Sequence, residues 1–127
     1  MHAQPNDRSC ASDAIGGNHF GPVMVYMSKV ADAEMADGSD PFFKIAESGY
    51  DADTDTWGTD ILNENCGKFD VTLPADLEAG DYLLRAEAIA LHAASQVNGA
   101  QFYVSCYVSF FRPNMLNVLT SLTWNSN

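Results

Sequence analysis

The sequence predicts an all-β protein, a β-sandwich with long loops. Five segments are rich in β-branched and aromatic residues, and several alternate in polarity as half-buried strands do. These segments recur at roughly even spacing between stretches rich in Gly, Pro, Asn and Asp, and only one short stretch carries a helix signal. At 127 residues, the chain is expected to form no more than one domain.

The first strand is expected at residues 19–30, after an aperiodic loop over residues 1–18. Gly21-Pro22 near its beginning suits the first residues of a strand, because proline cannot donate to a central ladder. After an acidic connector, the second strand is expected at residues 42–47.

The polar segment at residues 48–67 is expected to hold one helical turn, which begins near Trp57, runs through Leu62 and is capped by Thr59 or Asp60. The next strand covers residues 68–73. Residues 110–127 show neither a helical nor a strand period, and we expect a loosely packed tail there.

The last two strands lie within residues 80–106, joined by a short polar loop that contains Asn98-Gly99. Alternation of side chains places Gln101 and Tyr103 on one face, while the other face is apolar and contains Ala100, Phe102, Val104 and Cys106. If the two strands are neighbours, His92, Gln101 and Tyr103 gather at one edge of the sheet.

The charge is strongly acidic, with 17 acidic residues against 6 basic ones, a net charge of −11 and a pI of about 4.2. Such a surface repels phosphates and anionic lipids, so neither nucleic acid nor a membrane is expected as a partner. A neutral carbohydrate meets no such penalty. No apolar run approaches a membrane span, and the start of the chain lacks the basic and apolar regions of a signal peptide.

Three cysteines, Cys10, Cys66 and Cys106, allow at most one internal disulfide. The third thiol is then free, bridged to another molecule, or paired with a cysteine outside this chain. No two of them have CxxC spacing, which disfavours a zinc or redox motif.

His19 and His92 stand at strand ends, where functional side chains concentrate, although most histidines on strands are structural. Two imidazoles and the Tyr103 phenol suit a nitrogen and oxygen site, for which copper is a natural occupant. A catalytic zinc site would need three protein ligands, and no HExxH is present.

Other chemistries are less well supported. The alternating Asp51, Asp53 and Asp55 lack the glycine and terminal glutamate of a calcium loop. No two carboxylates are placed as a glycosidase pair, and no GxSxG elbow is present. Tyr50 and Trp57 could join Tyr103 in a sugar-stacking face, or pack structurally.

Blocks such as AIGGNHFGPVMVYMSKV, WGTDILNENCGK, LPADLEAGDYLLRAEAIALHAA and GAQFYVSC closely resemble the auxiliary activity family 9 lytic polysaccharide monooxygenases, formerly glycoside hydrolase family 61. The resemblance runs from about Met1 to Tyr107. It implies an immunoglobulin- or fibronectin-III-like β-sandwich with one copper ion on a flat face. It also implies secretion and oxidative cleavage of cellulose or a related β-glucan, with oxygen or hydrogen peroxide as co-substrate and an external reductant or electron-donor protein. A monomer is expected.

By the same resemblance, His19 in NHFGPV is the internal copper ligand, and Tyr103 in GAQFY is the axial residue. His92 in ALHAA and Gln101 in GAQFY are the catalytic pair that handles bound oxygen species. Such neighbouring donors commonly tune a metal site.

The sequence departs from the family in three respects. The N-terminal histidine that completes the family's copper site has no equivalent, since His2 resembles an internal position. The expected partner of Cys106 lies in the missing part, which leaves Cys10 and Cys66 to pair. We therefore expect residues 1–109 to be an N-terminally truncated catalytic domain and residues 110–127 a divergent tail.

As written, the chain is expected to bind copper weakly and to have little oxidative activity. Two alternatives stay open. The chain could be a non-catalytic β-sandwich that binds polysaccharide, or it could fold poorly because a sheet edge or core face is exposed.

Overall fold

A computed structural model describes residues 10–111 and 120–123 of the chain. Within these ranges one short helix, α1 (Gly58–Glu64), accompanies eight strands: β1 (Val23–Val30), β2 (Phe43–Ser48), β3 (Tyr50–Asp51), β4 (Thr56–Trp57), β5 (Lys68–Val71), β6 (Gly80–Ala90), β7 (Gln101–Phe111) and β8 (Thr120–Thr123).

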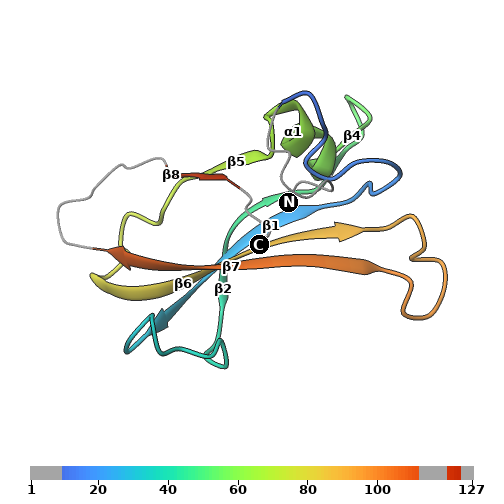
Figure 1. Ribbon diagram of the computed structural model, residues 1–127. Helices are drawn as coiled ribbons and strands as arrows, with labels where there is room; N and C mark the ends of the chain where they lie inside the picture. Colours follow the sequence, from blue (N-terminus) through green and yellow to red (C-terminus); the bar gives the residue numbers. More distant parts are fainter. Residues whose placement is uncertain (1–9, 112–119, 124–127) are drawn as a thin grey trace.

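The main sheet has four antiparallel strands in the order β2-β1-β6-β7. Two smaller antiparallel pairs, β5-β8 and β3-β4, lie with α1 above one face of this sheet (Figure 1). Two layers of antiparallel strands therefore enclose the core, and the predicted all-β sandwich is confirmed.

The core is built by alternate residues of the two central strands. Val23, Val25 and Met27 of β1 point inward, at most 1% exposed, and meet alternate residues of β6 such as Leu84 and Ala86. Leu62 of α1 and Val71 of β5 close the other side of the core. Val, Leu and Met at every second position are what a half-buried antiparallel strand requires.

The elements between residues 19 and 67 differ in detail from the predicted ones. The first strand begins at Val23, four residues later than predicted. Phe20 and Pro22 accept hydrogen bonds from the end of β6 and the residue after it, whereas the pairing with β2 begins only at Val23. The helix runs two residues further than expected, and the Asp60 carboxylate accepts a hydrogen bond from the Trp57 N–H at 2.7 Å. Thr59, the other predicted cap, bonds to Gly21 instead.

The elements from residue 91 onward also differ. The loop after β6 covers ten residues, 91–100, folded into successive turns, so the prediction of a short loop was wrong. β7 continues through Phe111, and Thr120–Thr123 forms β8 beside β5. Part of the stretch expected to be a loose tail therefore belongs to the sheets. Residues 1–9, 112–119 and 124–127 lie outside the described residues, and with them His2.

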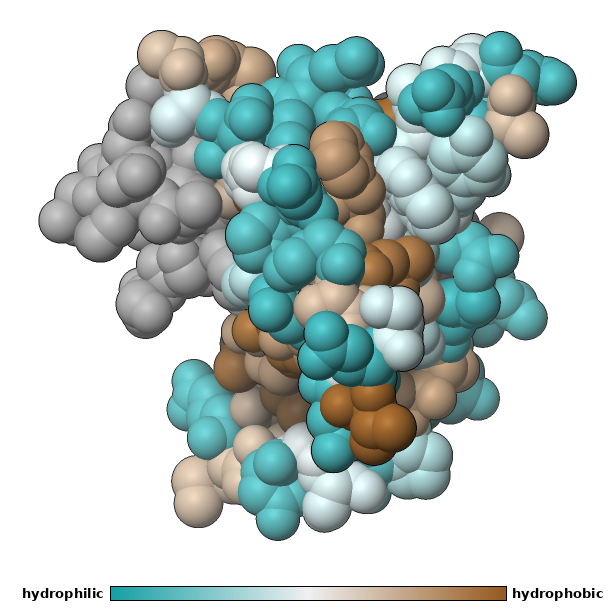
Figure 2. Space-filling model, turned by 90° about the vertical axis from the view of Figure 1, so that its right-hand side faces the viewer, coloured by the Kyte–Doolittle hydropathy of each residue, from teal (hydrophilic) through white to brown (hydrophobic). Residues whose placement is uncertain are grey.

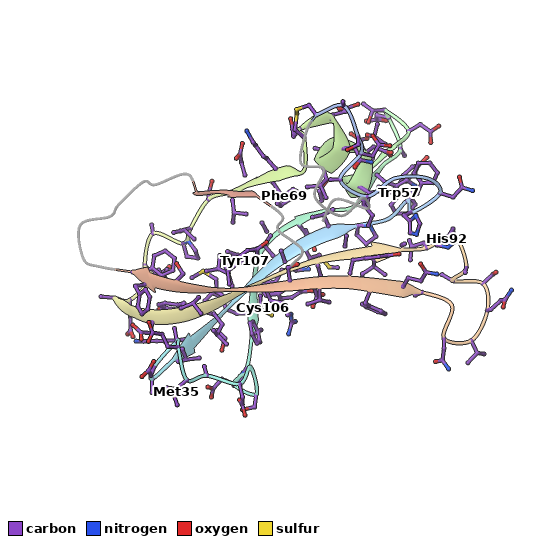
Figure 3. All side chains as sticks on the ribbon, viewed as in Figure 1. Met35, Trp57, Phe69, His92, Cys106 and Tyr107 are labelled. Atoms are coloured by element: carbon purple, nitrogen blue, oxygen red, sulfur yellow. A yellow bond between two sulfur atoms is a disulfide. The ribbon has the colours of Figure 1, made fainter. Side chains whose placement is uncertain are left out.

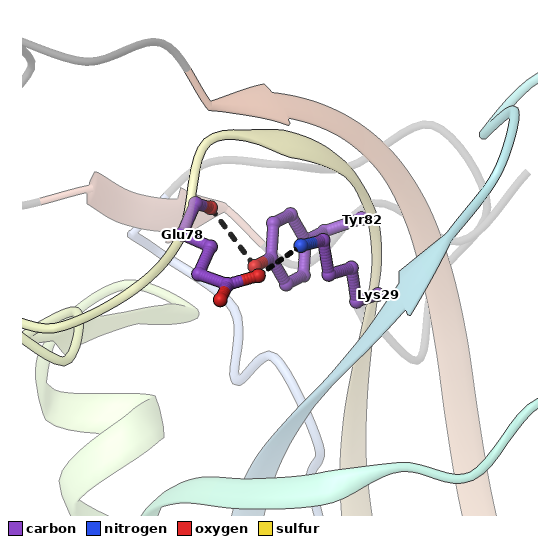
Figure 4. A network of polar contacts seen from close by, with 3 residues as sticks. All are labelled: Lys29, Glu78 and Tyr82. Atoms are coloured by element: carbon purple, nitrogen blue, oxygen red, sulfur yellow. Dashed lines mark hydrogen bonds and ion pairs between the residues drawn. The ribbon is translucent and has the colours of Figure 1, made fainter.

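One polar network ties the end of β1 to the turn before β6 (Figure 4). The Lys29 amine pairs with the Glu78 carboxylate, and the Tyr82 hydroxyl donates to the Glu78 carbonyl at 2.9 Å. The hydrogen bond between the two charged groups raises the pKa of Lys29 and lowers the pKa of Glu78. Both groups are exposed, so the pair positions the turn and contributes little to stability.

Candidate metal centre

His19 lies on a loop, residues 10–22, that is held in place by three kinds of contact. A disulfide joins Cys10 to Cys66 just beyond the helix, with 4.8 Å between their Cα atoms. The Ile15 N–H donates to the Asn63 side-chain carbonyl, and the Asn63 amide donates back to the Ile15 carbonyl, both at 3.0 Å. Ile15 itself is buried in the core. The loop is therefore held by covalent, polar and apolar contacts together.

The last residues of this loop are held at α1 and at the end of β6. Gly21 exchanges hydrogen bonds with Thr59, donating to its hydroxyl and accepting from its N–H, both at 3.1 Å. The Leu91 N–H donates to the Phe20 carbonyl at 2.9 Å, directly beside His92. These contacts bring the first histidine next to the second.

One ring nitrogen of His19 is already engaged. Nδ1 lies 2.6 Å from the Gly16 carbonyl oxygen, which can only accept, so Nδ1 carries the hydrogen. Gly17, with φ +69°, makes the turn that brings this carbonyl back to the ring. In the neutral imidazole, the lone pair is therefore on Nε2 and available to a metal.

His92 and Tyr103 lie against the His19 ring. The centroids of the two imidazoles are 4.8 Å apart, and the Tyr103 ring centroid is 5.6 Å from that of His19, both in edge-to-face geometry. The Tyr103 hydroxyl donates to the Gln101 side-chain oxygen at 3.1 Å. All four sequence-predicted site residues therefore meet at one end of the sandwich, where His92 projects beyond β6 (Figure 3).

The register of β6 and β7 explains the place of the two β7 residues. Gln101 is opposite Ala90, and Tyr103 is opposite Ala88. Both alanines are buried, and their methyl groups leave space on the inner face for the larger β7 side chains. Tyr103 is half-buried against the core, which restricts its ring.

The metal-binding atoms at this site are of types that copper binds, but there are few of them. Imidazole nitrogen is a preferred copper ligand, and a phenol serves as a weak additional ligand. Within residues 10–111 and 120–123, however, no group of three or more His, Cys, Asp or Glu side chains could hold a metal ion. The described residues therefore fit part of a copper site and do not complete one.

The end of the molecule that carries this cluster is largely hydrophilic. Figure 2 views this end and shows mostly teal surface with separate brown patches. Tyr50 and Trp57 form a ring pair with centroids 4.8 Å apart, and the ring of Tyr103 contacts His19. The Tyr50 hydroxyl donates to Asp55, which raises the pKa of Tyr50. Of the two alternatives left open for Tyr50 and Trp57, the structure shows the two rings packed on each other.

Two functional contributions were missed by the sequence reasoning. The Gly16 carbonyl selects the free nitrogen of His19, and Asn63 holds the loop from 48 residues away. The Gly16-Gly17 pair signals a turn, but no sequence pattern shows which backbone oxygen the turn presents.

These observations define a class of protein: an antiparallel β-sandwich that carries two histidines, a tyrosine and a glutamine at one end. The profile of Auxiliary Activity family 9 (formerly GH61) matches residues 4–109. The chain belongs to this family.

Relatives and solved structures agree with that assignment. The chain is 60% identical over 114 residues to an AA9 family lytic polysaccharide monooxygenase B of Thermothelomyces thermophilus, a match over 84% of this chain and 35% of that protein. The structure of CvAA9A has a TM-score of 0.77 and 34% identity, over 87% of this chain and 52% of that one. A structure described as a cellulose-active polysaccharide monooxygenase from M. thermophila has a TM-score of 0.56 and 31% identity, over 73% and 45%. The chain thus spans about a third of that first relative's length.

Proposed function

We propose that this chain carries part of a copper centre for oxidative cleavage of glycosidic bonds in cellulose or a related β-glucan. The contact of His19 with His92 and Tyr103 is the observation that carries the proposal. Family membership supports the type of reaction. Residues 1–109 would form the catalytic part and residues 110–127 a divergent extension.

Each residue has a distinct role in this proposal. His19 donates through Nε2, because Nδ1 is bonded to Gly16. Tyr103 would offer its phenol oxygen to the metal, and Gln101 orients that phenol by accepting its hydrogen bond. His92 is exposed beside these residues, and its ring nitrogens can exchange a hydrogen bond with a co-substrate. Copper, when bound, supplies the one-electron chemistry toward oxygen or hydrogen peroxide, with electrons from an external reductant.

Several properties favour a neutral polysaccharide surface as the substrate. The hydrophilic end seen in Figure 2 offers hydrogen-bonding groups, and a net charge of −11 does not repel a neutral glucan. The structural relative from M. thermophila is described as active on cellulose.

No helix among the described residues is long and apolar enough to cross a membrane. Secretion, as in the family, is part of this proposal.

Copper titration followed by electron paramagnetic resonance tests the metal site. The 127-residue chain should bind one copper ion weakly, and His19→Ala should raise the dissociation constant by about tenfold or more. His2→Ala is the matched control and should leave binding unchanged. A tight, three-nitrogen signal from the unmodified chain would contradict the proposed partial site.

A second candidate is a non-catalytic sandwich that binds polysaccharide. It is favoured by the lack of a three-ligand metal cluster within the described residues. A cellulose pull-down without copper or reductant, combined with an assay for soluble oxidised sugars, separates the two. Binding without oxidised products supports the second candidate, whereas oxidised products that require His19 support the first.

A further inference from the structure

Two polar side chains of α1 bond to the His19 loop on either side of the histidine. Thr59 and Asn63 are four residues apart, so they are neighbours on one face of the helix. Thr59 bonds to Gly21, two residues after the histidine. Asn63 bonds to Ile15, four residues before it. The histidine therefore lies between two points at which its loop is held.

The helix that carries these two side chains is anchored in the core of the sandwich. Leu62 is 1% exposed and belongs to the core, and Thr59 is also 1% exposed. The turn of helix between Thr59 and Asn63 is therefore packed against the main sheet. A loop that is bonded to this turn has a fixed position relative to the sheet.

The side chain of Asn63 matches both backbone groups of Ile15. Its carbonyl oxygen accepts from the Ile15 N–H, and its amide donates to the Ile15 carbonyl, both at 3.0 Å. An amide side chain offers an acceptor and a donor together, whereas a carboxylate offers acceptors only. The Ile15 side chain is 4% exposed and packs in the core. These contacts together hold the Ile15 backbone in one orientation.

The next carbonyl along the chain is the one that bonds to His19. The Gly16 carbonyl belongs to the peptide group between Gly16 and Gly17, and its oxygen lies 2.6 Å from His19 Nδ1. The backbone torsions on either side of a peptide group set its direction. Ile15 is held directly before this group, and Gly17 turns the chain directly after it with φ +69°. Asn63 and Gly17 therefore aim the Gly16 oxygen at the ring.

The Cys10–Cys66 disulfide cannot provide this orientation. Cys10 is six residues before Gly16, and each residue between them has two soft backbone torsions. The disulfide therefore limits how far the loop can move from α1, without selecting the direction of one carbonyl. The Asn63 bonds act on the residue directly before Gly16.

The direction of the Gly16 carbonyl decides which nitrogen of His19 carries the hydrogen. A neutral imidazole in water favours the hydrogen on Nε2, which leaves the lone pair on Nδ1. The Gly16 oxygen reverses this preference, because it can only accept and therefore requires the hydrogen on Nδ1. The lone pair is then on Nε2, the ring nitrogen farther from the loop backbone.

We propose that Asn63 is a positioning residue that, through the Gly16 carbonyl, fixes the tautomer of His19. The consequence for copper rests on the proposed function, whereas the tautomer exists without a metal. For a metal that binds at Nε2, the dissociation constant rises as the fraction of chains with a free Nε2 falls. A helix side chain thus sets the metal affinity of a histidine on a separate loop.

The test is nitrogen-15 magnetic resonance of the histidine rings in the full chain, without metal, at a pH of about 8.5, where an ordinary imidazole is neutral. The unmodified chain should have the His19 hydrogen mainly on Nδ1. Asn63→Asp removes the donor to the Ile15 carbonyl and places a carboxylate against it. The ratio of the Nδ1–H to the Nε2–H form should fall about fivefold, the change expected for loss of one hydrogen bond. The disulfide stays oxidised throughout.

Asn65→Asp is the matched control, because it adds the same charge at an exposed position at the end of the same helix. It should leave the His19 tautomer ratio unchanged. Gly17→Ala acts on the other side of the Gly16 carbonyl. Alanine disfavours a φ of +69°, so this variant should shift the ratio in the same direction as Asn63→Asp. Urea unfolding establishes that each variant is folded before the spectra are compared.

An unchanged His19 tautomer in folded Asn63→Asp would rule out the positioning role. Rapid exchange of the Ile15 amide hydrogen in the unmodified chain would rule it out as well, and this measurement requires no variant. Copper titration is a separate measurement, in which Asn63→Asp should raise the dissociation constant about twofold. A shifted tautomer with unchanged copper affinity would support the positioning role and count against His19 as a copper ligand.

Discussion

At the scale of single residues, the geometry of His19 illustrates what sequence patterns omit. The position of His19 at a loop-to-strand junction indicated a functional residue. Which of its nitrogens is free depends on the Gly16 carbonyl, which the positive φ of Gly17 helps to present. Every residue has a carbonyl, so composition and spacing contain no trace of this contact.

Gly21 provides a direct test of how tightly the His19 loop is packed. A Cβ atom at Gly21 would lie 1.8 Å from the Ile89 carbonyl oxygen, so Gly21→Ala must displace the loop from β6. We expect a loss of unfolding free energy of about 1–3 kcal/mol, typical of overpacking, and weaker copper binding.

Gly49→Ala is the control for this substitution, because nothing lies within 4 Å of its Cβ position. Urea unfolding followed by fluorescence measures both variants. Equal stabilities would show that the loop does not approach β6 as closely as described.

At the scale of elements, the two faces of β7 were predicted correctly as sets, but alternation alone does not decide which face is buried. The inner face is the one with Tyr103, Tyr107 and Phe111, which pack on the core. The other face is more uniformly apolar and is exposed instead; it includes Phe102, Val104, Val108 and Phe110. Burial follows from the position of β5 and α1 on one side of the sheet, which a strand's own sequence does not encode.

The neighbouring residues Phe110 and Phe111 separate these two environments. Phe111 packs edge-to-face on Tyr82 with 5.3 Å between centroids, whereas Phe110 faces outward. Phe111→Ala should lower the unfolding free energy by about 1–3 kcal/mol, less than a fully buried Phe would. Phe110→Ala should change it by less than about 0.5 kcal/mol.

Thermal or urea unfolding of dilute protein in the Cys106→Ser background, which removes the exposed thiol, measures this pair of variants. Similar effects of the two substitutions would mean that β7 ends before residue 111 and that the tail begins there.

The elements that escaped prediction share a physical cause. β3 and β4 have two residues each, too few to display a period. β8 has four residues and is stabilised by pairing with β5, about 50 residues away in sequence. The long strands β1, β6 and β7 were predicted because their periodicity extends over at least eight residues.

At the scale of the whole molecule, charge opposes folding more than it supports it. A net charge of −11 on a compact chain is self-repulsive, and the Lys29–Glu78 and Lys44–Glu47 ion pairs are exposed and weak. Sodium chloride raised from 0.01 to 0.15 M shortens the screening length from about 30 to about 8 Å. The melting temperature should rise by a few degrees, roughly 1 kcal/mol of stability.

Differential scanning calorimetry of the Cys106→Ser variant at low concentration and neutral pH provides this measurement. A melting temperature that falls as salt is added would indicate that attractive pairs outweigh the net repulsion.

The site as a whole was more predictable than its attachment to the fold. His19, His92, Gln101 and Tyr103 were chosen from residue type and family resemblance, and they meet in space. The contacts that bring them together, from Asn63 and Thr59, join segments 38–48 residues apart. Such long-range polar pairs depend on the tertiary structure and have no local signature.

The Cys10–Cys66 bridge has a practical consequence for any assay of this protein. Thiol reagents such as dithiothreitol donate electrons by exchange with disulfides, so they would open this bridge and release one end of the His19 loop. Ascorbate donates electrons without thiol exchange and leaves the loop tethered. The reductant therefore acts on the protein as well as on the reaction, and loss of activity in a thiol buffer would report the state of the scaffold.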